Sequence, residues 1–310
     1  MLDTPLSAPR LIAAPPGRYR VGMPQLALNG LSESWLLAEC GDRHWQLLAR
    51  AGGTPIAQLH DSRGRRVYPA FRSVRLRNAE LDAIAENDVL EIDSTLGRVS
   101  RTQFYSKHVI STGQGLRAVV EMQSVFVARE TAGVNTSAVR SSVAGFDQVA
   151  ELQEGLRFAA YNRASMQAHH GQDTRNGRHN HSYAPVPIRP CPSVHFNGAG
   201  FLYFARFHEL VDQAEWAWFD PGIPPFVTTE RHVLYHGNAD VGTTLIVQLC
   251  REEQDDASQE YHAKLVRTDD NQVIADITTR RHVAQYPRVW CAPRIIVPEV
   301  QMAVPDVKPS

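Results

Sequence analysis

The sequence of 310 residues has no excess of positive charge, no paired-cysteine motif and no long hydrophobic run. Its formal net charge is −1, whereas a nucleic-acid binder needs clustered Lys and Arg to neutralise phosphates, so nucleic acid is not an expected partner. Its four cysteines form no CxxC pair, which favours thiols in a reducing compartment over a disulfide framework or a zinc finger. No apolar run approaches the roughly 20 residues of a membrane span, and Asp3 and Pro15-Pro16 interrupt the start, where a signal peptide would lie. These absences predict a cytoplasmic protein without a membrane partner.

What the sequence does contain is a repeated order of elements, one helix followed by about four strands. The expected strands are rich in β-branched and aromatic residues and end at turn residues. In the first half, a short strand at 18–23 precedes a helix that opens at Asn29-Gly30, and strands are expected at 67–77, 88–96, 101–110 and 116–128. In the second half, a helix that opens at Asn197-Gly198 precedes strands at 227–237, 243–251, 259–268 and 272–283. This order predicts an α+β fold built from two similar units.

The second helix is predicted from its apolar spacing. Apolar or small residues recur at intervals of four, three, four, three and four, which places them on one helical face: Gly200, Phe204, Phe207, Val211, Ala214 and Trp218. Further aromatic residues near the start widen this face beyond an ordinary stripe. We therefore expect the first turn of this helix to be enclosed.

These patterns divide the chain into five segments. They are a Pro-rich leader (1–17), a first unit (18–130), a polar linker (131–190), a second unit (191–284) and a C-terminal tail (285–310).

The linker contains four histidines that raise the possibility of a metal site: His169, His170, His179 and His181. Their spacing matches neither a helical HExxH motif nor a zinc finger, and the residues around them are typical of a linker. We expect no metal and no cofactor, and predict that a chelator leaves activity unchanged.

Three stretches resemble a known family. FNGAGFLYFARFHELVDQAEWA, YHGNADVGTTLIV and, in the first half, RRVYPAFRSVRLR are similar to the bifunctional acyltransferase/decarboxylases of leinamycin biosynthesis. The resemblance covers most of residues 20–285 and implies a double hot-dog fold, in which each of two antiparallel sheets wraps around a central helix. It also implies an enzyme of polyketide pathways that decarboxylates methylmalonyl-CoA and passes the propionyl group to an acyl carrier protein. Acyl-CoA and the carrier protein are then the expected partners, and a homodimer is one arrangement left open.

The resemblance further implies a catalytic role for Tyr68, within VYPAF, either as an acyl acceptor or as a hydroxyl that orients the substrate. Both roles stay open, because a tyrosine with a pKa of about 10 is a poor nucleophile at neutral pH. Strand alternation places Tyr68 and Arg72 on one face and Phe71 on the other, although Pro69 can mark a bulge. Phe71 and Arg72 are candidate substrate-binding residues. An ordinary strand tyrosine is the alternative interpretation.

Asn29 and Asn197, at the expected helix starts, are candidate catalytic donors. Free N–H groups at a helix N-terminus can polarise a thioester carbonyl or stabilise an enolate, and Gly198 and Gly200 allow a substrate to approach the backbone closely. Decarboxylation requires donors to the enolate rather than a base, so further polar residues are assigned to substrate binding: Ser32, His236 and Asn238. The alternative for each asparagine is a helix N-cap.

Six arginines lie between Arg63 and Arg77, among them Arg72 and Arg75. Such a cluster can pair with coenzyme A phosphates or with the acidic helix of a carrier protein. A solvated strand edge is the alternative. We assign the cluster, represented by Arg72 and Arg75, to substrate binding.

Other functions of the same fold stay open. Hydrolases of this fold commonly carry a carboxylate where this chain has Asn197, and the dehydratase motif HxxxGxxxxP is absent. A thioesterase or dehydratase acting on acyl carrier protein substrates is therefore the alternative rather than the main prediction. A non-catalytic module that binds acyl carrier proteins is a second alternative.

Overall fold

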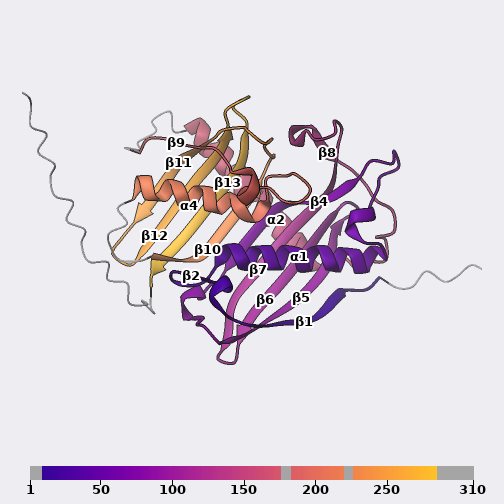
Figure 1. The fold of residues 1–310 in the computed structure, drawn as a ribbon, viewed down its shortest axis with the longest axis horizontal. Coiled ribbons are helices and arrows are strands. Elements are labelled where there is room, and N and C mark those ends of the chain that lie inside the picture. The colour runs from indigo at the N-terminus through magenta and orange to yellow at the C-terminus, as the bar shows by residue number, and fades with distance from the viewer. Residues whose placement is uncertain (1–8, 176–182, 220–225, 285–310) are drawn as a thin grey trace, which may run out of the picture.

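A long antiparallel sheet organises the molecule (Figure 1). The computed structural model describes residues 9–175, 183–219 and 226–284, and within these residues the sheet has eleven strands. The strands of its first half are β1 (Ile12–Arg20), β4 (Val67–Arg77), β5 (Val89–Ser100), β6 (Gln103–Thr112) and β7 (Gly115–Arg129). Those of its second half are β9 (Val186–Ile188), β10 (Phe226–Tyr235), β11 (Leu245–Gln254), β12 (Ser258–Arg267) and β13 (Val273–Val283). The short β8 (Ala138–Arg140) pairs with the end of β7.

The order of the strands is symmetric about the centre of the sheet. It reads β1-β5-β6-β7-β4 and then β10-β13-β12-β11-β9. Counted from the outer edge of the sheet to its centre, the two halves therefore have the same strand order. The halves meet where β10 pairs with β4, from Arg231 opposite Leu76 to Leu234 opposite Ser73. We call this the seam. Each half is one strand, one long helix and four strands, which confirms the predicted α+β double hot-dog.

The long helices of the two halves lie on the same face of the sheet. They are α1 (Glu33–Gly52) and α4 (Phe207–Trp218), and both contribute buried residues to one core. Leu36 and Leu37 of α1 and Leu210 and Val211 of α4 are almost completely inaccessible to solvent. Burial of such side chains contributes roughly 1.5–3 kcal/mol each, so the helices hold the two halves together through a common hydrophobic layer.

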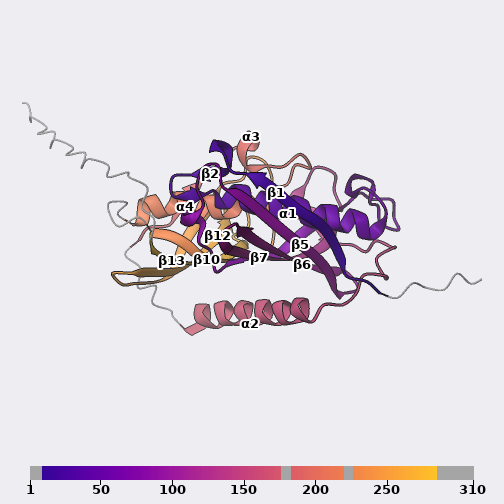
Figure 2. The same ribbon diagram turned by 90° about the horizontal axis from the view of Figure 1, so that it is seen from below.

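A third long helix covers the opposite face, as Figure 2 shows. This helix, α2 (Gln153–Arg175), lies within the segment 131–190 that was expected to be a polar linker. Buried Asn162 donates to the Ser73 hydroxyl (2.6 Å) and to the Gln123 side chain (2.8 Å), and its carbonyl oxygen lies 2.9 Å from Nε2 of His232. Since Ser73 belongs to β4 and His232 to β10, α2 is fixed across the seam.

Neither long helix begins at the asparagine predicted to start it. The first begins at Glu33, because the Ser32 hydroxyl accepts the N–H of Trp35 at 3.2 Å and caps it. Asn29 precedes β3 (Gly30–Leu31), which pairs with β2 (Leu26–Ala27). The second begins only at Phe207, after a 3-10 turn at Phe204–Arg206. Both helix-start predictions were therefore wrong.

Other boundaries also differ from the prediction. The first strand begins at Ile12 rather than at residue 18, and a register shift between Ala14 and Gly17 accommodates Pro15-Pro16. A short helix, α3 (Pro192–His195), precedes the loop to α4. No helix among the described residues is long and apolar enough to span a bilayer.

Candidate functional site

A pocket lies beside the seam, where β4 and β10 separate. Their pairing stops at Ser73 and Leu234, while β4 extends back to Val67. The space left open forms a cavity of about 550 Å³. Its walls come from β4, from residues 197–207, from residues 235–238 after β10, and from residues 135–140. Both halves of the chain and the segment that joins them thus contribute to one site.

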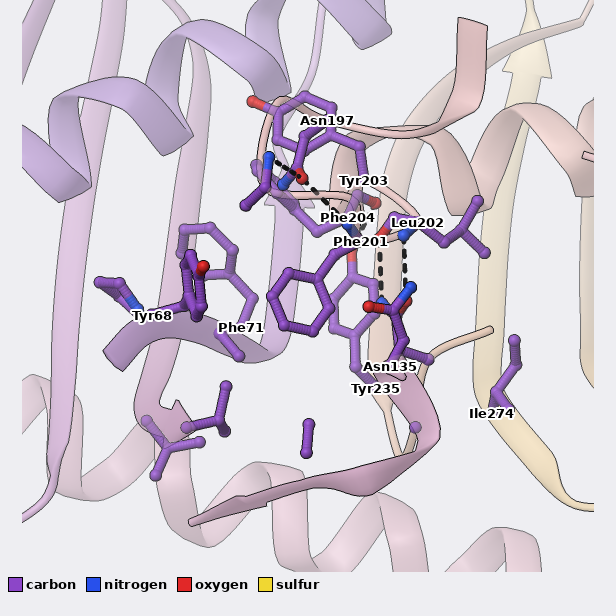
Figure 3. Close-up of a pocket in the computed structure, with 18 of the residues that line it drawn as sticks. Tyr68, Phe71, Asn135, Asn197, Phe201, Leu202, Tyr203, Phe204, Tyr235 and Ile274 are labelled. Atoms are coloured by element: carbon purple, nitrogen blue, oxygen red, sulfur yellow. Dashed lines mark hydrogen bonds between the residues drawn. The ribbon is translucent and has the colours of Figure 1, made fainter. Parts of the chain in front are cut away.

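Aromatic side chains form the centre of the pocket (Figure 3). The rings of Tyr68 and Phe201 meet edge to face at 5.2 Å, and those of Phe71 and Phe204 lie 4.2 Å apart. Figure 3 shows Tyr68 and Phe71 on one side of the pocket, with Phe201 near its middle. Such walls exclude water from an acyl chain or a reacting thioester.

Two side-chain donors at the pocket have no acceptor among the described residues. They are the hydroxyl of Tyr68 and the Nδ2 amino group of Asn197, and both residues line the cavity. A substrate oxygen can accept from either donor. Trp45 also lines the cavity, and its indole Nε1 is buried without a partner among the described residues, which costs about 1–3 kcal/mol. Sequence reasoning missed Trp45, whose position on α1 gave it the appearance of a core residue.

Asn197 shapes the loop that precedes α4. Its Oδ1 accepts the backbone N–H groups of Ala199 (3.0 Å) and Phe201 (3.1 Å), which is the hydrogen bonding of a side-chain-stabilised turn rather than of a helix N-cap. Gly200 completes the turn at a φ of 77°. Gly198 lines the cavity, with open space where a side chain would project.

The other predicted donors differ in their surroundings. Asn238 lines the pocket, but its amide pairs with the backbone of Leu202, accepting at 2.9 Å and donating at 3.0 Å. His236 also lines the pocket, and its Nε2 lies 2.7 Å from Oδ2 of Asp276. Burial raises the pKa of Asp276, but hydrogen bonds from His236 and His262 outweigh burial and hold that pKa below its usual value. An ionised Asp276 therefore orients the His236 ring.

Asn135 is a buried residue of the site that the sequence did not reveal. Its Nδ2 donates to the backbone oxygens of Gly200 (2.7 Å) and Ala239 (2.8 Å), and its Oδ1 accepts from Nε of Arg129 at 3.0 Å. It therefore ties both loops of the second half to the end of β7. Because residues 131–190 were assigned to a linker, no sequence pattern pointed to it.

Arginines supply the positive charge of the pocket. Among the described lining residues there is no Asp or Glu, whereas four arginines line the cavity: Arg66, Arg72, Arg140 and Arg267. Arg267 is paired with Asp270, which does not line the cavity. Half-buried Arg72 stands at a β-bulge between Phe71 and Ser73. Burial, and then the charge of Arg140, lower the pKa of Arg72. Tyr68, Phe71 and Arg72 all line the cavity, although strand alternation was expected to separate Phe71 from the other two.

Four predicted site residues do not line the cavity, and three of them lie in other parts of the fold. Ser32 caps α1, and Asn29 precedes β3. Arg75 forms an ion pair with Glu230 and lies 4.5 Å from the ring centre of Tyr161 on α2. None of the three lines the cavity, and neither does Gly200. The structure thus gathers Tyr68, Phe71, Arg72, Asn197, Gly198, His236 and Asn238.

Comparisons with known proteins identify the fold. No protein-family model and no curated protein matches the chain. An acyl-ACP thioesterase from Bacteroides thetaiotaomicron matches in structure with a TM-score of 0.59 at 10% identity, over 86% of this chain and 97% of that one. The 12:0-ACP thioesterase from Umbellularia californica matches with a TM-score of 0.58 at 9% identity, over 86% of this chain and 93% of that one. At such identities the likeness establishes the double hot-dog fold alone.

Proposed function

We propose that this chain decarboxylates methylmalonyl-CoA, or a related acyl-CoA, and transfers the acyl group to an acyl carrier protein. The observation that supports this proposal is the composition of the pocket. Aromatic rings and unpaired donors line it together with Arg72, and no carboxylate is found among its described lining residues. A site of this kind suits a reaction in which negative charge develops on the substrate.

The first step is loss of carbon dioxide. The bond from Cα to the carboxyl carbon breaks, and its electron pair becomes an enolate shared between Cα and the thioester oxygen. We assign the substrate carboxylate to the aromatic side, near Phe201, where poor hydration favours its departure. Asn197 Nδ2 and the positive charge of Arg72 are assigned to the thioester oxygen, where they act more strongly on the enolate than on the substrate.

The second step is protonation and transfer. A proton adds to Cα, and the candidate donors at the pocket are Tyr68 and the His236 ring held by Asp276. The phosphopantetheine thiol of the carrier then attacks the thioester carbonyl, the bond to the coenzyme A sulfur breaks, and coenzyme A leaves. If Tyr68 is an acyl acceptor, an acyl-tyrosine precedes this transfer; if it orients the substrate, transfer is direct.

Intact-mass spectrometry of the carrier protein tests this proposal. Incubation with methylmalonyl-CoA and a phosphopantetheinylated carrier should add a propionyl group to the carrier, with release of carbon dioxide and without early free propionate. Loading that retains the carboxyl group would remove decarboxylation from the proposal. If a panel of acyl-CoAs leaves the carrier unchanged while the carrier still binds, the chain is a binding module and the proposal fails.

Hydrolysis of an acyl thioester is the second candidate, and the His236–Asp276 pair favours it. A neutral imidazole oriented by a carboxylate can take a proton from water as the water attacks the thioester carbonyl. The two solved structures described above are named as acyl-ACP thioesterases. This reaction predicts free acid and an unloaded carrier in the same assay, so one experiment separates the two candidates.

A further inference from the structure

A second cluster of titratable side chains lies beneath α2, on the face of the sheet away from α1 and α4. His169 of α2, His262 of β12 and Asp276 of β13 each place one possible ligand atom within 4.8 Å of the other two. We propose that these three residues bind a divalent zinc ion. Two imidazoles and one carboxylate, with a coordination position left open, form a ligand set that zinc accepts.

The least satisfied member of this cluster is His169. Its Nδ1 is buried and has no hydrogen-bond partner among the described residues, whereas both oxygens of Asp276 already accept from histidines. A buried nitrogen without a partner is explained if it is a ligand.

The three side chains must rearrange to close the site around an ion. Zinc–ligand bonds of about 2.0–2.2 Å place tetrahedral ligand atoms roughly 3.4 Å apart. The rings of His169 and His262 are stacked at 4.0 Å with 21° between their planes. Because an imidazole nitrogen binds a metal in the plane of its ring, one ring must rotate. The half-buried His169, on the surface of a helix, is free to make that movement more readily than His262.

Zinc also has to replace an existing hydrogen bond. Nε2 of His262 lies 2.7 Å from Oδ1 of Asp276, and coordination by this nitrogen requires its proton to move to Nδ1 or to leave. The other oxygen of Asp276 can keep its 2.7 Å contact with His236, which then supports the ligand from outside the site. The positive charge of nearby Lys264 disfavours additional positive charge at His169, and it therefore also disfavours a bound cation. We therefore expect a removable ion rather than a permanent structural zinc.

The proposed ion has a direct connection to the pocket. Asp276 bridges the cluster and His236, and His236 lines the cavity. No sequence pattern indicated this arrangement, because His262 and Asp276 are far from the linker histidines in sequence and on different strands. The expectation that no metal binds rested on the spacing of the linker histidines and on the residues around them.

Equilibrium dialysis of the full chain against zinc sulfate, followed by metal analysis, tests the proposal. We expect about one zinc per chain. His169→Ala should weaken zinc binding at least about tenfold, because even the loss of a residue that only supports a ligand lowers metal affinity by that factor. His60→Ala is the matched control, since His60 is exposed and its ring nitrogen Nδ1 is hydrogen-bonded to the backbone oxygen of Gln58 at 2.8 Å, far from the cluster in sequence. Cobalt(II) should give visible absorption with the wild type that His169→Ala loses.

A second pair of measurements keeps the test decisive. Zinc should raise the melting temperature of the wild type and of His60→Ala but not that of His169→Ala, because an ion stabilises only the state that binds it. A double variant, His179→Ala with His181→Ala, should still bind zinc. If that double variant loses zinc while His169→Ala retains it, or if no zinc binds, the proposal is wrong. None of these outcomes depends on the acyl-transfer reaction.

Discussion

At the scale of single residues, Asn197 and Asn238 use the same side-chain amide in different ways. Asn238 uses both Oδ1 and Nδ2 in hydrogen bonds with the backbone of Leu202. Asn197 uses only Oδ1 to form its turn, and its Nδ2 has no partner among the described residues. The residue type alone did not distinguish these cases, because both asparagines are next to glycine in the sequence. Of these two asparagines, only Asn197 therefore remains a candidate donor to the substrate.

Replacement of Asn197 by aspartate separates its contribution to the loop from its contribution as a donor to the substrate. A carboxylate can accept the same N–H groups of Ala199 and Phe201, so the folded loop should persist. It cannot donate, and its charge opposes an enolate, so decarboxylation should fall by roughly 10²-fold. Carbon dioxide release and thermal melting should be measured in parallel. A fully active Asn197→Asp variant would show that this side chain only shapes the loop.

The hydroxyl of Tyr68 can be removed without changing the aromatic contacts. Tyr68→Phe keeps the edge-to-face packing on Phe201 and the flanking Arg66 and Arg129, so the protein should fold and bind substrate. Acyl transfer should fall by at least roughly 10²-fold, the scale of a lost catalytic group. Single-turnover loading of the carrier protein measures this. Transfer at the wild-type rate would exclude Tyr68 from the mechanism.

At the scale of elements, strands were predicted better than helix boundaries. Strand β4 lies at the residues predicted for it, because alternating apolar and polar residues between turns specify a half-buried strand. The aromatic pattern that follows Asn197 was assigned to a helix from its first residue. The structure uses residues 197–203 for a turn and a bridge between Phe196 and Leu202. The spacing of apolar residues does not predict such a turn, because the turn is formed by hydrogen bonds of Asn197 that the sequence does not show.

Helix α2 was missed for a different reason. Its sequence is largely polar, so it lacks the apolar stripe from which a packed helix is usually recognised. It packs through a short apolar patch, in which Phe158 and Ala159 meet Val99 and Tyr105. It also packs through buried Asn162, whose partners in β4, β7 and β10 are distant in sequence. The same distance concealed Asn135, which joins β7 to loops of the second half. Sequence reasoning finds contacts that repeat locally and misses single polar side chains that join distant elements.

The role of α2 can be measured by removing its central contact. Asn162→Ala removes the hydrogen bonds that this residue forms with the Ser73 hydroxyl, with Oε1 of Gln123 and with Nε2 of His232, which should lower the free energy of unfolding by about 1–3 kcal/mol. Arg163→Ala, at an exposed neighbouring position of α2, is the control and should change stability by less than about 0.5 kcal/mol. Urea denaturation gives both values. Equal effects of the two variants would mean that Asn162 does not anchor the helix.

At the scale of the whole molecule, the buried histidines couple folding to pH. Burial lowers the pKa of His44 and of His232 to about 3 each, and also lowers the pKa of His108. In the unfolded chain a histidine has a pKa near 6.5. Below pH 6.5 the unfolded state therefore binds protons that the folded state does not, and stability is lost as the pH falls from 6.5 toward 3. Above pH 6.5 these groups are neutral in both states and add no pH dependence.

This linkage predicts a measurable slope and a variant that changes it. Between pH 6 and pH 4.5, each such histidine should lower the free energy of unfolding by about 1.4 kcal/mol per pH unit. His232→Gln should remove one of these contributions, because glutamine can keep a hydrogen bond to Asn162 but does not titrate. His60→Gln, the same substitution at an exposed histidine, is the matched control, because it replaces no buried side chain. Urea denaturation at several pH values gives the slopes. An equal slope for the wild type and His232→Gln would mean that His232 takes up a proton in the folded protein as readily as in the unfolded chain, and the buried, neutral state assigned to it would be wrong.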